Sequence, residues 1–182
     1  MAHFVSGRYL GHVEVNAIQG DEVVRDAIHR LKDVIKVASS SRQSSGSRRQ
    51  STNTRKSSAS TEPPASPAGG DEAENSVVTV NMPALLVVSS EGIRIIDEIS
   101  RDVHSNVIIK AVSYSTEVIG KKIELFAFIE VDDRRNTKTC HVFMCEKGVK
   151  DAALAICNAV CAAFEAAVAE AKARAGNPLL PM

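Results

Sequence analysis

Apolar and polar residues change their spacing along the first third of the chain. The opening stretch GRYLGHVEV alternates and carries β-branched residues, which predicts a strand over Tyr9–Val15. From Val24 to Ile35 the apolar residues instead recur every three or four positions, which predicts an amphipathic helix. Asp21 lies just before that stripe and is the expected N-cap. The chain therefore begins with a strand followed by a helix.

Strand patterns return after Ser76 and end in a long helical pattern. The apolar, β-branched stretches are SVVTVNMPALLVVSS, EGIRIID, VIIKAVSYS, IELFAFIEV and KTCHVFMCE. The short spacings between them predict an antiparallel meander. A final stripe predicts a helix over about Val149–Ala175, with an inner face of Val149, Ala153, Ile156, Val160, Phe164 and Ala167. Because the strands are segregated from the helices, the fold class is α+β.

Residues 38–76 interrupt these patterns with a stretch that has almost no large apolar side chain. Such a composition cannot bury enough surface to offset the entropy of ordering it. We expect one domain over 5–176, interrupted by a disordered insertion at 38–76 and followed by a tail at 177–182. Three interpretations of the basic first half of the insertion stay open: a solvated loop, a site of Ser/Thr phosphorylation, or a contact with anionic lipid. The insertion has no aromatic side chain to stack on bases, so no nucleic-acid partner is expected.

The composition of the chain limits which partners and which location are expected. The formal net charge of the 182 residues is zero, so overall charge does not indicate a partner. No apolar run of about 18 residues occurs, and the N-terminal residues lack the apolar segment of a signal peptide, so neither a transmembrane helix nor export is expected. The four cysteines lack C-x-x-C spacing, and the simplest interpretation is that their thiols are reduced. We therefore expect a cytoplasmic protein.

Two cysteine-containing segments are candidates for a catalytic or metal site. Cys140 and His141 are adjacent in a predicted strand, where neighbouring side chains point to opposite faces, so they make a poor nucleophile and base. A structural thiol beside an exposed or cross-strand histidine is favoured. Cys157 and Cys161 share a helical face but have no second ligand pair, which favours core packing over zinc. No phosphate loop or hydrolase motif occurs. We expect no catalytic residues, no metal and no cofactor.

The turn between the last two predicted strands carries Arg134, Arg135 and Lys138. A charged hairpin tip is usually only solvated. A sheet closed by one long helix, however, often leaves an open strand beside that helix, to which an extended peptide can add. Basic side chains close to such an edge would then bind an anionic group of the peptide.

In their order along the chain, these segments resemble a phosphotyrosine-binding (PTB) domain, which has a pleckstrin-homology-like fold. YLGHVEV resembles its first strand and DEVVRDAIHRLK the helix after it; EGIRIID, AVSYS, FAFIEV and TCHVFMCE resemble later strands, and AICNAVCAAFEAAV the final helix. The Shc branch is most similar, through NMPALLVVSS, the long basic insertion and RAGNPLLP, with the Disabled and Numb branch second. The resemblance implies an antiparallel β-sandwich or partly open barrel capped by a long C-terminal helix, with a second helix after the first strand.

The resemblance also implies a function. It implies a monomeric, non-enzymatic adaptor that binds tyrosine-phosphorylated Asn-Pro-x-Tyr segments of receptors or signalling proteins by β-augmentation between the fifth strand and the last helix. The implied strand-pairing residues are Ile109, Lys110, Ala111 and Val112, and the implied apolar pocket residues are Val160 and Phe164.

For the phosphate, the resemblance implies Ser113, Lys138 and either Arg135 or Arg134. Lys138 stands where the Shc branch has one arginine, and the first-loop arginine of that branch has no counterpart beside Gln19 and Gly20. Two alternatives therefore stay open: phosphorylation-independent binding of Asn-Pro-x-Tyr peptides, and binding of phosphoinositides at a membrane surface. An anionic phospholipid is thus a second candidate partner, with recruitment to the inner face of the plasma membrane.

Overall fold

The computed structural model describes residues 2–33, 35–36, 76–120, 123–146, 149 and 151–175. Apart from Ser76, the expected insertion at 38–76 lies outside these residues, and so does the expected tail at 177–182. The proposed domain limits of 5–176 therefore stay a prediction.

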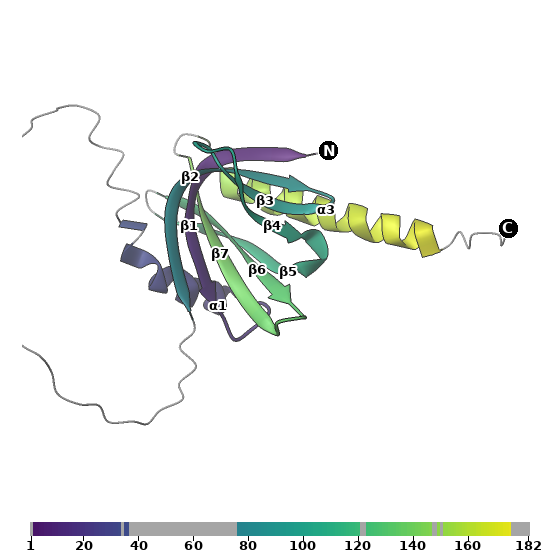
Figure 1. Ribbon diagram of the computed structural model, residues 1–182, viewed down its shortest axis with the longest axis horizontal. Helices are drawn as coiled ribbons and strands as arrows, with labels where there is room; N and C mark the ends of the chain where they lie inside the picture. Colours follow the sequence, from purple (N-terminus) through teal and green to yellow (C-terminus); the bar gives the residue numbers. More distant parts are fainter. Residues whose placement is uncertain are drawn as a thin grey trace, which may run out of the picture.

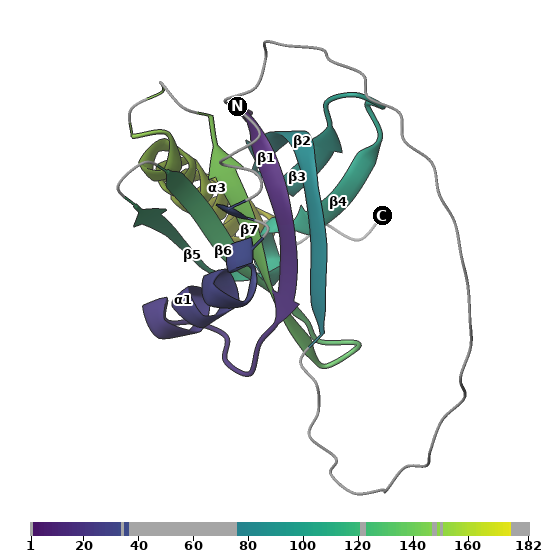
Figure 2. The same ribbon diagram turned by 90° about the vertical axis from the view of Figure 1, so that its left-hand side faces the viewer.

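The described elements form one curled antiparallel sheet and two principal helices. They are β1 (His3–Glu14), α1 (Asp21–Arg30), β2 (Val77–Ser89), β3 (Gly92–Asp97), β4 (Val103–Ile108), the short 3₁₀ helix η2 (Ile109–Ala111), β5 (Val112–Ile119), β6 (Glu124–Asp132), β7 (Thr137–Cys145) and α3 (Ala152–Ala175). The strand order is β4-β3-β2-β1-β7-β6-β5, with antiparallel neighbours throughout. Figure 2 shows β4 and β5 apart at the two edges of the curled sheet. The expected α+β class and partly open barrel are confirmed.

The expected strand VIIKAVSYS is wrong as a single strand. It contains the end of β4, the turn η2 and the start of β5. The reason is topological, because the chain must leave one edge of the sheet here and cross to the other. Ile109 holds the crossing in place, since its side chain is buried and its N–H donates to the carbonyl oxygen of Glu91 at 3.1 Å. Ile109, Lys110 and Ala111 therefore do not lie in a strand.

The expected N-cap of α1 is also wrong by one residue. Gly20 is the N-cap, with φ of 121°, and no side chain caps the helix. Asp21 is the first helical residue, where a carboxylate still interacts favourably with the helix dipole. Its Oδ1 atom instead accepts a hydrogen bond of 2.5 Å from the hydroxyl of Tyr114, which ties α1 to β5.

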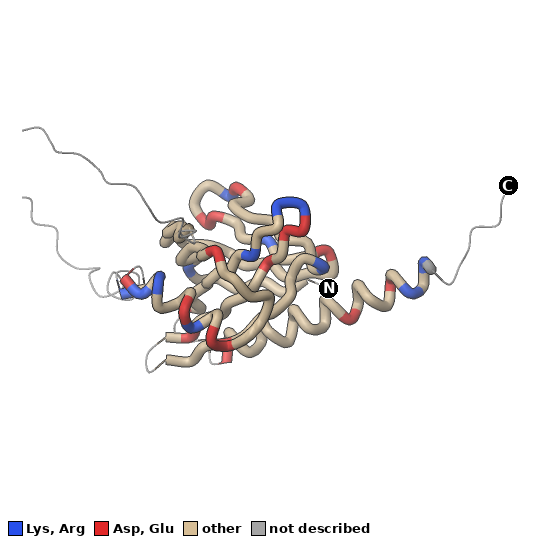
Figure 3. The backbone as a smooth tube through the Cα atoms, turned by 90° about the horizontal axis from the view of Figure 1, so that it is seen from below, with Lys and Arg blue, Asp and Glu red and all other residues tan. Residues whose placement is uncertain are grey.

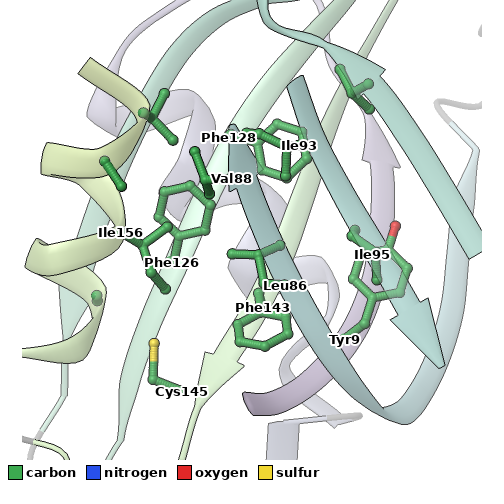
Figure 4. Close-up of a cluster of buried hydrophobic side chains, with 14 of the residues drawn as sticks. Tyr9, Leu86, Val88, Ile93, Ile95, Phe126, Phe128, Phe143, Cys145 and Ile156 are labelled. Atoms are coloured by element: carbon green, nitrogen blue, oxygen red, sulfur yellow. The ribbon is translucent and has the colours of Figure 1, made fainter. Parts of the chain in front are cut away.

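The apolar runs of β6 and β7 supply both faces of the sheet. Phe126 and Phe128 join the core under α3, whereas Leu125, Ala127 and Ile129 join a second core under α1. In β7, Phe143 and Cys145 face α3, and Cys140, Val142 and Met144 face α1. Alternation of side chains across a strand explains this division, and burial of both faces explains why these runs contain so few polar residues. Figure 4 shows the aromatic part of the core beneath α3.

A β-bulge in β1 changes which residues share a face. The register with both neighbouring strands shifts between Tyr9 and Gly11. Gly11 has φ of 136°, and a Cβ atom there would lie 2.1 Å from the carbonyl oxygen of Val78, so the position requires glycine. Because of the extra residue, Tyr9 and His12 both project from the concave face that α3 covers.

The long helix α3 packs along the concave face and runs beyond the sheet (Figure 1). Its start is fixed by Glu124, whose Oε2 atom accepts hydrogen bonds from the backbone N–H groups of Ala152 and Ala153 at 3.0 and 3.5 Å. By length and composition alone α3 could cross a membrane, although the sequence has no uninterrupted apolar run of about 18 residues. Ile156 and Val160 are buried against the sheet, and we interpret α3 as a core helix of the domain.

Candidate functional site

The edge strand β5 lies beside α3 with a groove between them. In the described part of the chain, β5 pairs with β6 on one side and with no strand on the other. Its outer N–H and C=O groups therefore form a template for a further strand. The groove has a volume of about 530 Å³ and is lined by Ile109, Lys110, Val112, Ser113, Tyr114, Ser115, Val160, Cys161, Phe164 and Glu165.

The helix side of this groove is mainly apolar. Val160 is 5% exposed and forms part of its floor, whereas Phe164 is 47% exposed and projects from the next turn. A half-exposed phenylalanine beside an unpaired strand edge leaves apolar surface for a ligand to cover. The structure thus brings together both residues that were expected to form an apolar pocket. Whether they bind a peptide stays a prediction.

A second hollow of about 540 Å³ adjoins the groove at the open seam of the barrel. Lys110 and Ser113 border both spaces. The remaining lining residues come from β4, η2, and β6 with the turn that follows it: Asn106, Ile108, Ala111, Glu130, Val131, Asp132, Asp133 and Arg134. We call this space the seam hollow. An extended ligand that follows β5 toward its first residue would enter it.

Two of the expected phosphate ligands lie against one loop. Ser113 occupies the bulge at the start of β5, and its hydroxyl donates to the carbonyl oxygen of Ile18 at 2.6 Å. The ammonium group of Lys138 donates to the carbonyl oxygen of Asn16 at 3.3 Å. The loop between β1 and α1 therefore engages both side chains.

The two arginines of the hairpin tip are separated by their local contacts. Asp132 accepts hydrogen bonds from the backbone N–H groups of Arg134 and Arg135 at 3.0 and 3.3 Å, which closes the turn. The Arg135 side chain is 82% exposed and pairs with Asp132 at 3.7 Å, so it behaves as a solvated tip residue. Only Arg134 borders the seam hollow.

The lining of the seam hollow carries charges of both signs. Three of its residues are acidic (Glu130, Asp132 and Asp133), and two are basic (Lys110 and Arg134). Elsewhere on the described backbone, Lys and Arg are interspersed with Asp and Glu (Figure 3). The basic part of the insertion lies outside the described residues, so an anionic phospholipid partner stays a prediction.

Cys140 and His141 do not form a pair of nucleophile and base. Cys140 is buried on the α1 side of β7, and burial raises the pKa of its thiol to about 12. His141 projects from the opposite face and contacts Tyr9 and Glu130, so the prediction that the pair is split across the strand is confirmed. Cys157 is half-buried, and its thiol pKa is raised to about 11, mainly by burial. Among the described residues, no group of three or more possible ligands is arranged to hold a metal ion.

Comparison with protein-family models assigns the fold to a family. Residues 69–174 match the model of the phosphotyrosine interaction domain (PTB/PID). The chain belongs to the PTB/PID family. PTB/PID domains are protein-interaction modules that bind Asn-Pro-x-Tyr peptides.

A solved structure shows the same fold. The chain is similar to the solution structure of the C-terminal phosphotyrosine interaction domain of APBB2 from mouse, with a TM-score of 0.53 and 19% identity over 91% of this chain and 87% of that one. A search of curated proteins found no match. Neither the family model nor the APBB2 domain supports the expected placement in the Shc branch.

Sequence reasoning missed the acidic lining of this PTB/PID site. Glu130 faces the seam hollow because it follows Phe128 by two positions in β6 and so projects from the same face. The alternation of side chains in β6 could be predicted from the sequence. The position of Asn106 beside the seam hollow could not, because β4 and β6 do not pair and meet only across the curled sheet.

Proposed function

We propose that this PTB/PID domain is a non-enzymatic adaptor module that binds Asn-Pro-x-Tyr peptides by strand addition to β5 and does not require phosphate. The observation that carries the proposal is the unpaired outer edge of β5 beside the apolar groove along α3. Backbone hydrogen bonds to such an edge provide affinity for an extended peptide, and side-chain pockets beside it provide selectivity.

The direction of the peptide follows from the order of the two spaces. An antiparallel partner of β5 has its upstream residues near Ile119 and its downstream end near Val112. Apolar residues upstream of the Asn-Pro turn would then cover Phe164, and the tyrosine would reach the seam hollow next to Ser113. This arrangement uses both spaces and needs no movement of the sheet.

Electrostatics supports the phosphate-independent alternative. A phosphate group would add about two negative charges next to a hollow in which carboxylates already outnumber cations. Lys138 and Ser113 are also engaged by carbonyl groups of the loop before α1, and phosphate binding would have to replace those bonds. A neutral tyrosine does not incur this repulsion.

Paired titrations test the proposal. Three versions of one peptide are needed: Asn-Pro-x-Tyr with an apolar residue upstream, its phosphotyrosine form, and a form with two prolines in the strand-pairing segment. We expect the tyrosine peptide to bind at least as tightly as its phosphorylated form. The proline form should lose most of its affinity, because proline lacks the N–H that strand pairing uses.

Two outcomes would decide against parts of this proposal. Full affinity of the proline form would exclude strand addition. Much tighter binding of the phosphopeptide, lost selectively in Lys138→Ala, would restore the phosphotyrosine-dependent function expected from the sequence. In the proposed mode, Lys138→Ala changes neither affinity.

A further inference from the structure

A relay of four polar side chains leads from the seam hollow into the core. The Nε2 atom of His141 lies 3.1 Å from Oε2 of Glu130, which borders the hollow. On the other side of the ring, Nδ1 of His141 lies 2.8 Å from the hydroxyl of Tyr9. That hydroxyl lies 3.1 Å from Nδ1 of His12. We call this set the histidine relay.

The relay is part of the packed core and not a surface cluster. Tyr9 is 1% exposed and His141 is 5% exposed. The ring of His141 stacks on Phe128 with centroids 4.7 Å apart and an interplanar angle of 7°. Packing therefore fixes the ring, so the relay must adapt to a proton by redistributing hydrogen atoms.

Hydrogen-bond chemistry assigns one arrangement to the neutral relay. A carboxylate only accepts, so His141 donates from Nε2 to Glu130 and its Nδ1 atom is unprotonated. That nitrogen accepts the hydroxyl proton of Tyr9, whose oxygen accepts from Nδ1–H of His12. Every contact is then satisfied with both histidines neutral. Among the described residues, no buried side-chain nitrogen or oxygen lacks a partner.

The relay has room for one additional proton but not for two. When Nδ1 of His141 carries a proton, it donates to the Tyr9 oxygen, and the Tyr9 hydroxyl donates to Nδ1 of His12 instead. His12 must then carry its own hydrogen on Nε2. A second proton would leave the Tyr9 hydroxyl without an acceptor. It would also place two cations on rings whose centroids are 5.4 Å apart.

The groups that face Tyr9 and the two histidines come from three further strands. From β4, the ring of His104 lies with its centroid 5.3 Å from that of Tyr9. From β6, Glu130 is the acidic group, and from β2 the cross-strand partner of His12 is Val78, which does not ionise. Burial lowers the pKa of His12 first, then His141 and His104 do so, while Glu130 opposes them.

We propose that the histidine relay makes the charge of the seam hollow depend on pH, so that acidification allows the site to accept an anionic side chain at the tyrosine position. This inference rests on the proposed function. At neutral pH the carboxylates exceed the cations by one. One proton on the relay places an imidazolium against Glu130 and cancels that excess.

A peptide pair of constant charge tests the inference. Sulfotyrosine stays anionic across the histidine range, unlike phosphotyrosine, whose own second pKa is about 6. The probes are one Asn-Pro-x-Tyr peptide and its sulfotyrosine form, both without His, Asp or Glu. The quantity to measure is the Kd of the sulfotyrosine peptide divided by the Kd of the tyrosine peptide. We expect this ratio to fall about fivefold from about pH 7.5 to pH 5.5, because the sulfotyrosine peptide gains affinity relative to the other.

The matched variant is His141→Gln, which keeps an amide donor for Glu130 but cannot titrate. Its ratio should stay constant with pH, and an equal fall would overturn the proposal. A constant ratio in the wild-type protein would overturn it as well. If neither peptide binds at either pH, the proposed function fails, and with it the regulation of that site.

A second measurement covers the case in which His141→Gln does not fold. Linkage is reciprocal, so the sulfotyrosine peptide must raise the pH midpoint at which the His12 ring signals shift in NMR spectra of the wild-type protein. The tyrosine peptide must raise it less. Equal midpoints with both peptides would overturn the inference even where both peptides bind.

Discussion

Replacing Phe164 with alanine should weaken peptide binding with little effect on the fold. Phe164 is 47% exposed, and a phenylalanine side chain presents about 200 Å², so about 90 Å² of apolar surface is left for a peptide to cover. At about 25 cal/mol per Å² this surface is worth about 2 kcal/mol, or about a thirtyfold change in Kd. Alanine keeps its Cβ atom, so we expect a loss of about ten- to thirtyfold.

The assay is fluorescence anisotropy with a labelled Asn-Pro-x-Tyr peptide, alongside thermal unfolding of each variant. Val168→Ala is the matched control, because Val168 lies one turn further along α3, is 37% exposed and does not line the groove. It should bind like the wild-type protein. Equal affinity of Phe164→Ala and Val168→Ala would refute the placement of the peptide beside α3, provided that both variants melt cooperatively.

Three further predictions follow from the described contacts. In the native protein, exposed Cys161 should react with a thiol reagent and be protected by bound peptide, whereas Cys145, whose pKa burial raises to about 12, should react only after unfolding. Glu124→Gln should lower the free energy of unfolding in urea by about 1 kcal/mol, because a charged acceptor at the start of α3 is lost. The pKa of His12 lies below its ordinary value of 6.5, so the unfolded chain binds more protons below that pH, and stability should fall on acidification. His12→Asn should reduce this fall in urea titrations at several pH values.

The strands and helices were predictable because their patterns are local. The alternation in FAFIEV and TCHVFMC corresponds directly to two buried faces, and the spacing from Ala153 to Val160 corresponds to the buried side of α3. The break at Ile109 was not predictable in this way. VIIKAVSYS satisfies a strand pattern throughout, and only the need to cross between sheet edges forces the turn.

The charged site was harder to predict, because its charges arrive from separate strands. Arg135 pairs with Asp132, which lies only three positions before it. The sequence alone could therefore predict that Asp132 competes with a phosphate group for this arginine. Asn106 and Glu130 are far apart along the chain, and only the sheet order brings them to one hollow. His12 and His141 are also far apart along the chain, and strand pairing makes them direct cross-strand partners in β1 and β7.

Glu130 connects the two proposals, because it borders the proposed tyrosine site and also accepts the hydrogen bond that orders His141. A lysine or arginine at this position would make the hollow net positive and leave His141 without its acceptor. A phosphate-binding hollow and a histidine relay of this kind are therefore alternatives at one position of β6. Glu130→Gln separates the two effects, because it removes the charge but keeps an amide oxygen for His141. It should bring the affinity for a sulfotyrosine peptide closer to that for the tyrosine peptide at neutral pH. The ratio should still fall on acidification, because the relay keeps its hydrogen bonds and only the charge of Glu130 is lost.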